Sequence, residues 1–469
     1  MTFLADRLTD PLVASEYPHH RPAMRVFFLL QHWLLDTDSF AVPESLCTFQ
    51  QSIPLEWVQQ ALELTNKSSI RRRKLPAELV VWLVVAMGLF RDRSIAEVVS
   101  KLDLSLQNSA GDTVAPSAIP QARQRLTYEP LAKLFGITGQ HWAQQEDSHD
   151  TWHGLNLFSV DGTQFRTADT DELATHFGRI KHSATRSTEY PVVRLCALSS
   201  LRSRLIRDVV FGPSTDGEVT YAKQLVGKVP NHSLTIFDRC YLSAELLVNW
   251  QRAQSGSHWM VPLKSNTKYT ILHRYSDHDF LVEMAVSAHA RKLDPSLPEH
   301  WTARLVLYPP VTNKRHIQGV LSSLTDTSVY PAQDILDVYF ERWEIENSYA
   351  ELKHQMLEDS ILLRSLSVDG VYQEIWGVLL AYNLVRVEIS RIATEAKVSP
   401  LRISFVMALR DIQDEILWCA IAAPGSIPTK LKAMRERVKR YILPEKRKRP
   451  KDRTVRISKT RYPVRSKHS

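Results

Sequence analysis

Hydrophobic and polar positions follow two different periods along the chain, and the change of period separates helical segments from strand-forming ones. Residues 51–140 carry apolar positions at helical spacing and include an apolar run at residues 79–90. Residues 153–263 contain short apolar runs of strand length, interrupted by helical patterns at residues 218–226 and 243–250. The order strand, hairpin, helix, strand, helix, strand predicts a mixed sheet with helices on its faces.

Two of the predicted strands lead directly into an aspartate. The apolar run at residues 157–160 precedes Asp161, and the run at residues 233–237 precedes Asp238. Taken alone, each aspartate is typical of a turn that follows a strand. If the first and fourth strands are neighbours, however, both carboxylates come together at one end of the sheet, where ligands commonly bind.

The longest helical pattern covers residues 332–357, follows Pro331 and predicts one continuous helix. A helical wheel predicts a solvent-facing side that consists of Asp337, Glu341, Glu344, Ser348 and Glu351. A second polar stripe, formed by Tyr339, Arg342, Glu346 and Lys353, lies between two apolar stripes and is expected to face the protein interior. Two interpretations fit this stripe. Arg342 and Glu346 form an ordinary i,i+4 ion pair beside a snorkelling lysine, or Glu346 is a functional carboxylate with neighbouring cations that bind phosphate.

The spacing Tyr339-x2-Arg342-x3-Glu346-x6-Lys353 resembles the YREK signature of DDE transposases of the insertion sequence 4 family. The segments VDGT around Asp161 and FDRCY around Asp238 are similar to the same family, as are RRRKLP and QARQRL in the N-terminal part. The resemblance extends over about residues 50–465.

This resemblance implies an α+β multidomain fold with a ribonuclease-H-like mixed α/β catalytic core. The domains expected from it are an N-terminal extension at 1–50, a helical DNA-binding domain at 51–145, a catalytic domain at 153–390 with a β-rich insertion at about 265–325, and a helical C-terminal region with a basic tail at 391–469.

The resemblance also implies a catalytic and metal-binding triad of Asp161, Asp238 and Glu346. Two Mg²⁺ ions are expected there, with Mn²⁺ able to substitute, because carboxylates suit hard cations and paired metals promote phosphodiester chemistry. The expected activity is cleavage at the terminal inverted repeats of an insertion element, followed by strand transfer. Arg342 and Lys353 would hold phosphates of the element's end, and Tyr339 would add a further DNA contact or pack in the core.

Three more arginines are candidate DNA contacts. Arg123 and Arg125 fall in a short predicted helix that begins at Ser117, which is expected to cap it. That helix either enters a DNA groove in helix-turn-helix manner or is an ordinary surface helix. Arg239, next to Asp238, contacts DNA or pairs with an acid. Trp259 and Trp301 are interpreted either as core residues or as platforms for an unstacked base.

The charge of the C-terminal segment indicates a binding partner. The 469-residue chain carries a net charge of +8, but residues 430–469 alone hold 17 Lys and Arg against 3 Asp and Glu, a balance of +14 that leaves −6 for the rest. Such a tail indicates a polyanionic partner, most often nucleic acid, or a disordered solubilising segment. The resemblance implies that this partner is double-stranded DNA. The family resemblance adds a homodimer in the synaptic complex.

Location follows from the ends and the cysteines. The first ten residues do not have the pattern of a signal peptide, and the apolar runs are too short to span a membrane. Four scattered cysteines predict neither a disulfide framework nor a zinc site. We expect a bacterial cytoplasmic protein that is associated with the nucleoid when it is bound to DNA, and no membrane partner.

Two other functions use some of the same features. One is a non-catalytic DNA-binding derivative, which would not need the three acidic residues. The other is a structure-selective ribonuclease-H-like nuclease, which would need neither an N-terminal end-binding domain nor the cations at positions 342 and 353.

Removing residues 444–469 tests the role of the basic tail. We expect the logarithm of the DNA association constant to fall less steeply with the logarithm of salt concentration, because fewer phosphates are neutralised. Fluorescence anisotropy over a salt series measures the slope. An unchanged slope would mean that the tail does not touch DNA.

Overall fold

The computed structural model describes residues 52–69, 75–102, 114–146, 150–180, 188–308, 319–357, 362–419 and 425–445. All of them belong to one compact unit within residues 44–469. The predicted N-terminal extension and most of the predicted basic tail lie outside the described residues. None of the described helices combines the length and the apolar content needed to cross a bilayer.

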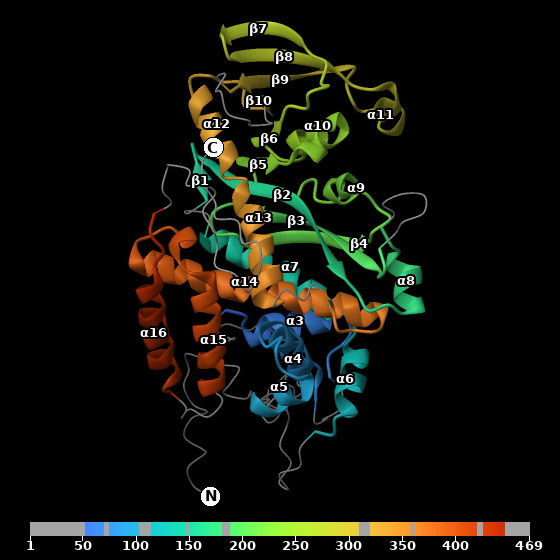
Figure 1. The fold of residues 1–469 in the computed structure, drawn as a ribbon, viewed down its shortest axis with the longest axis vertical. Helices are drawn as coiled ribbons and strands as arrows, with labels where there is room; N and C mark the ends of the chain where they lie inside the picture. The colour runs from blue at the N-terminus through green and yellow to red at the C-terminus, as the bar shows by residue number, and fades with distance from the viewer. Residues whose placement is uncertain are drawn as a thin grey trace, which may run out of the picture. The chain divides into compact units, whose positions relative to one another are not determined.

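A ten-stranded mixed sheet runs through the described part of the chain, with β1 paired beside its main path (Figure 1). The strand order is β4-β3-β2-β5-β6-β10-β9-β8-β7. The strands are β1 (Thr151–Trp152), β2 (Leu155–Arg166), β3 (Val192–Ser200), β4 (Ile206–Pro213), β5 (Ser233–Phe237), β6 (Ser257–Pro262), β7 (Thr270–Ser276), β8 (Asp279–Ala285), β9 (His300–Leu307) and β10 (Gly319–Ser322).

The predicted neighbours are confirmed. Strand β2 pairs parallel with β5, and β5 pairs parallel with β6, while β2, β3 and β4 form antiparallel pairs. The β-rich segment is present as β7 to β10, and it continues the same sheet through the β6–β10 pairing. All seven residues of strand β7, within this segment, are exposed.

Alternate residues of the central strands pack on opposite faces of the sheet. Phe158 and Val160 of β2 join one core cluster with helices α9 (Glu218–Lys223) and α10 (Ala244–Ala253). Leu155 and Leu157 join another cluster with helix α12 (Ala332–Phe340). This is the period of two that an extended strand imposes.

The single helix predicted at residues 332–357 is wrong in its continuity. Helix α12 ends at Phe340, helix α13 covers Trp343–Ala350, and a π-helical turn, η4, covers Glu351–Met356. At the break between α12 and α13 the hydrogen bonds follow the tighter 3-10 pattern, because the amides of Glu341 and Arg342 donate to carbonyls three residues earlier instead of four. The tighter turn and the wider π-turn both change the helical phase, so a wheel drawn at a constant 100° misplaces residues beyond the break.

Helix α14 (Val368–Ala396) contacts helices from both ends of the chain (Figure 1). The other helices are α3 (Leu55–Leu64), α4 (Ala77–Leu89), α5 (Ile95–Lys101), α6 (Ala118–Leu126), α7 (Glu129–Glu146), α8 (Asp171–Phe177), α11 (Ala288–Leu293), α15 (Phe405–Cys419) and α16 (Ile427–Val438). Asn383 of α14 exchanges two hydrogen bonds with the backbone of Ile206, so the helix is also fixed to the start of β4.

The structure corrects two predictions, on the end of the Asp161 strand and on the Ser117 cap, and decides between the two interpretations of the tryptophans. The strand that contains Asp161 does not end in a turn there, because pairing with β3 continues to Arg166. Ser117 precedes α6 but makes no side-chain cap bond. Trp259 and Trp301 are core residues, 0% and 9% exposed, with ring centroids 5.3 Å apart.

Helices α4 and α14 cross at two glycines. A Cβ atom on Gly377 would lie 2.6 Å from the Val84 carbonyl oxygen, and one on Gly88 would lie 2.9 Å from the Gly377 carbonyl oxygen. The backbones therefore approach too closely for any side chain. We expect Gly377→Ala to lower the free energy of unfolding by about 1–3 kcal/mol, the usual cost of overpacking.

Chemical denaturation measures this change, and Gly136→Ala in α7 is its control. A Cβ atom at Gly136 meets nothing within 4 Å, so that substitution should stabilise the helix by about 0.5–1 kcal/mol. Equal effects at both glycines would contradict the close crossing.

Candidate active site

The register of two parallel strands brings Asp161 and Asp238 together. Val160 is paired with Phe237, and the next residue on each strand is an aspartate. Parallel neighbours lie about 4.8 Å apart. Asp161 has the same parity as Leu157, and Asp238 has the same parity as Ile236, so both side chains belong to the face that α12 covers.

Asp161 is held in an environment that disfavours its charge. Burial raises the pKa of its carboxyl to about 6, and the nearby charges of Asp238 and Glu218 add to the rise. The Gly162 amide, which donates to Oδ1 over 2.8 Å, and the Arg342 guanidinium act in the opposite direction. Negative charge is therefore concentrated at this point of the sheet.

Arg342 connects the strand carboxylates to Glu346. Its Nη2 donates to Oε1 of Glu346 over 2.8 Å, and it interacts electrostatically with Asp161 and Asp238. The sequence left an ion pair and a functional site as alternatives. The structure contains the i,i+4 ion pair, and the functional role of Glu346 stays a prediction. Glu346 keeps 37% of its side-chain surface exposed, so it can exchange this partner for another.

Lys353 and Tyr339 flank the cluster in different ways. Burial lowers the pKa of Lys353, while the charge of Asp161 opposes that change. Tyr339 is 2% exposed and packs in the α12 core, where burial raises its pKa to about 12. Its ring is therefore a packing residue beside Arg342 in this structure.

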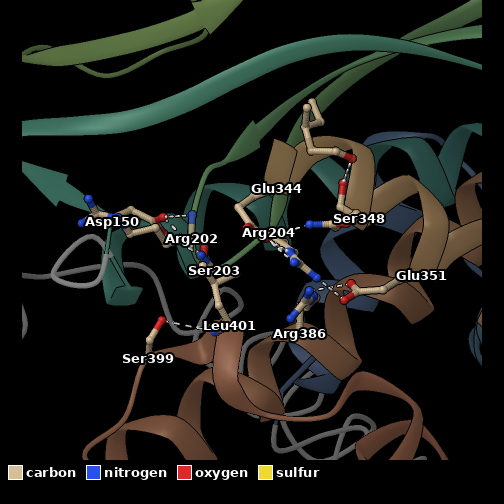
Figure 2. Close-up of polar contacts among 12 residues, drawn as sticks. Asp150, Arg202, Ser203, Arg204, Glu344, Ser348, Glu351, Arg386, Ser399 and Leu401 are labelled. Atoms are coloured by element: carbon tan, nitrogen blue, oxygen red, sulfur yellow. Dashed lines mark hydrogen bonds and ion pairs between the residues drawn. The ribbon is translucent and has the colours of Figure 1, made fainter. Parts of the chain in front are cut away.

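A buried ion network positions helix α13 (Figure 2). Arg204, in the turn between β3 and β4, donates to Glu344 from Nε over 3.1 Å and forms further ion pairs with Glu344 and Glu351. Glu351 also pairs with Arg386 of α14 and accepts from the Tyr382 hydroxyl over 3.2 Å. Each carboxylate thus has cationic partners that offset its desolvation.

This network corrects the predicted solvent face of the helix. Glu344 is 5% exposed and Ser348 is 1% exposed. Glu341 is also engaged, through two bonds from Arg202 of 2.8 and 3.0 Å. The helical wheel wrongly predicted that these acids face solvent, because arginines from a distant turn pair with them and compensate the cost of their burial.

Two polar residues near the site were not predicted from the sequence. Glu218 begins α9 on the opposite face, and a Cβ atom on Gly162 would lie 2.8 Å from its Cδ. Lys264 follows β6, the parallel neighbour of β5, and its Nζ donates to the Leu242 carbonyl over 3.4 Å. Only their positions could have indicated them, since Glu218 stands at the start of a helix and Lys264 follows a strand of the parallel part of the sheet.

The other predicted DNA contacts lie in different surroundings. Arg123 donates to Gln373 over 2.7 Å and to Ser365 over 3.3 Å, so its guanidinium joins α6 to α14 and the segment before it. Arg125 is exposed on the same helix, and Arg239 is half-buried in a short turn directly after Asp238. The structure therefore groups Arg239 with the carboxylates and Arg123 with the helical part.

The donor chemistry of the cluster suits a hard divalent cation, because Asp161 and Asp238 are adjacent carboxylates with unfavourable mutual charge. Among the described residues, no three His, Cys, Asp or Glu side chains are arranged to hold a metal ion. Glu346 is paired with Arg342 in this structure. Asp161 and Asp238 fit a cation by position and chemistry, and Glu346 fits by chemistry alone.

Comparison with known proteins gives consistent matches along the chain. Residues 43–136 match the family model described as Insertion element 4 transposase N-terminal, and residues 152–384 match Transposase DDE domain. The chain is 35% identical over 415 residues to Transposase InsG for insertion sequence element IS4 of Escherichia coli (strain K12), covering 88% of this chain and 92% of that protein.

Two further matches are more limited. Putative transposase InsZ of the same organism is 37% identical over 225 residues, which cover 48% of this chain and 74% of InsZ. A solved structure of a piggyBac transposase synaptic complex with hairpin DNA is 11% identical, with a TM-score of 0.39 and 88% coverage of each chain.

The raised pKa of Asp161 predicts a pH-dependent cost to folding. Its folded-state pKa of about 6 exceeds the unfolded value of about 3.9. The fold therefore prefers the neutral acid, and stability is lost as pH rises from about 4 to about 6. We expect Asp161→Asn to raise the free energy of unfolding by about 1–3 kcal/mol at pH 8, and by much less at pH 4.5.

Thermal unfolding at both pH values, without added metal, tests this expectation. Asp277→Asn serves as control, since that side chain is 92% exposed and should respond little at either pH. A stabilisation by Asp161→Asn of equal size at both values would show that charge is not its cause.

Proposed function

The chain belongs to the insertion sequence 4 family of DDE transposases, and from this premise we propose that it binds the terminal inverted repeats of its element, cleaves there and transfers the strands to target DNA. The observation that best supports the cleavage chemistry is the β2–β5 register, with one aspartate following each of two paired residues. Glu346 of helix α13 is the proposed third carboxylate, because its partner Arg342 also interacts electrostatically with Asp238.

In this proposal Asp161, Asp238 and Glu346 hold the divalent metal, expected as two Mg²⁺ ions with Mn²⁺ as substitute. The bound cations supply an activated nucleophile and neutralise charge at phosphorus. The carboxylates fix the position of that chemistry at one point of a rigid sheet. The nearby charges of Asp238 and Glu218, which help to raise the pKa of Asp161, favour the binding of a cation there.

Arg342 exchanges partners in this scheme. In the absence of DNA its guanidinium offsets the carboxylates. With a DNA end bound and divalent metal held by the carboxylates, the Arg342 guanidinium would be available to bind a phosphate. Arginine suits both partners because its planar donors match carboxylate and phosphate geometry. Lys353 and Arg239 contribute positive charge beside the same site.

The architecture that we propose is a ribonuclease-H-like catalytic core at 153–390 with an insertion at about 265–325. Support comes from the strand order β4-β3-β2-β5-β6 and from strands β7 to β9, which extend the sheet beyond β6 and β10. A helical DNA-binding domain at 51–145 and a C-terminal region at 391–469 complete it. In this domain we propose Arg125, which is exposed on α6, as a DNA contact.

The partners follow from this activity. Double-stranded DNA is bound both as element ends and as target. Because two ends are joined in one event, we propose a homodimer as the synaptic form. Since the relatives are bacterial transposases, the proposed place of action is the bacterial nucleoid in the cytoplasm.

Glu346→Gln tests the proposed chemistry. The substitution preserves shape and removes one negative charge, so we expect cleavage to fall below detection while affinity for end DNA changes less than about threefold. The assay uses a supercoiled plasmid that carries the repeats flanking the coding region, with Mg²⁺, and a gel-shift measurement reports end binding.

Glu436→Gln on α16, an acid 57% exposed, is the matched control and should cleave normally. Cleavage retained by Glu346→Gln would refute the role of Glu346 in metal binding. If the unaltered protein ignored the repeats and cut branched or RNA–DNA substrates, a ribonuclease-H-like nuclease would replace the transposase mechanism. Binding to ends without cleavage under any metal would indicate a non-catalytic derivative.

A further inference from the structure

Tyr349 joins helix α13 directly to the strand that carries Asp161. Its hydroxyl donates a 2.6 Å hydrogen bond to the main-chain carbonyl of Asp161. The residue is 7% exposed, so this bond is shielded from water. Tyr349 follows Glu346 by three residues, and residues at that spacing are neighbours on one side of a helix.

The carbonyl that accepts this bond belongs to the β2 residue directly opposite Ala197 in the β2–β3 ladder. One side chain of α13 therefore bonds to the sheet at the position of the aspartate. Burial raises the pKa of Tyr349 well above its usual value, so the hydroxyl keeps its proton and remains a donor.

The other attachments of α13 lie away from this point. Arg204 binds Glu344 and Glu351 from the turn between β3 and β4, and the Ser348 hydroxyl bonds within the helix, to Ile345, over 2.7 Å. These contacts fix where the helix runs. They do not reach the backbone of Asp161.

We propose that Tyr349 is a positioning residue that sets the separation between the carboxylates of Glu346 and Asp161. The proposal rests on the function proposed above for those two residues. Asp161 is fixed to β2 through its own backbone, and that backbone is fixed to α13 through the hydroxyl. A helix attached in this way presents Glu346 at one defined height above the sheet.

The consequence concerns metal affinity more than stability. Groups that orient ligating residues typically change metal affinity or activity by about 10–100-fold when they are removed. Tyr349→Phe keeps the ring and removes the bridge. We expect an apparent dissociation constant for Mn²⁺ about 10-fold weaker, with end-DNA affinity unchanged.

The experiment uses the full chain bound to pre-cleaved end DNA, so that binding can be measured without turnover. Calorimetric titration with Mn²⁺ gives the affinity, and the Mn²⁺ dependence of cleavage gives a second value that should shift by the same factor. Tyr221→Phe is the matched control, because Tyr221 is 3% exposed and its hydroxyl donates to the Pro213 carbonyl over 2.8 Å, in helix α9. It should lose comparable thermal stability and keep the Mn²⁺ affinity.

Equal Mn²⁺ affinity in Tyr349→Phe and the unaltered protein would overturn the proposal. To separate positioning from folding, 4-aminophenylalanine at position 349 restores a donor of similar reach and should recover most of the affinity. The proposal would also be overturned if the folded aminophenylalanine protein bound Mn²⁺ as weakly as Tyr349→Phe does. The same holds if the weaker Mn²⁺ binding of Tyr349→Phe came only from unfolding of that variant.

These outcomes are distinct from failure of the proposed function. If the unaltered protein bound no Mn²⁺ and Asp161→Asn made no difference, the metal site itself would be rejected. If the unaltered protein bound Mn²⁺ and lost it in Asp161→Asn, the site would stand, and only the comparison at position 349 would decide the role of Tyr349.

Discussion

Burial of charge around Arg204 constrains the position of the helical segment that carries Glu346. Two acids of one helical segment, Glu344 and Glu351, meet this guanidinium, and Arg386 holds the second acid from α14. Loss of one partner from a buried ion pair typically costs about 3–5 kcal/mol, since the other charge is left without compensation. The segment between Trp343 and Met356 therefore cannot slide or rotate without separating these charges.

Helix α13 is regular between two irregular ends, and its sides have different partners. Glu344 and Glu351, which are seven residues apart and therefore share one side, meet Arg204. Tyr349 lies on another side and bonds to the main-chain carbonyl of Asp161. The tight turn before α13 and the π-turn after it change the helical phase of the segments on either side.

The sequence predicted the sheet and its key neighbours well, because strand period and strand order are properties of short segments. It also predicted that Asp161 and Asp238 meet, although the strand of Asp161 continues past it. It failed at Glu344, whose burial depends on an arginine about 140 positions earlier in the chain, and at Glu218 and Tyr349. Their significance arises from contacts across elements, which no local pattern encodes.

The parallel pairing of β2 and β5 also has a temporal consequence. Asp161 and Asp238 belong to strands joined by a long connection, and the third carboxylate arrives only with α13, about 100 residues later. During synthesis the two aspartates can therefore be paired before the remainder of the cluster exists. Since non-local contacts form late and domains fold as they are made, a chain that ends before α13 carries the two aspartates without Glu346.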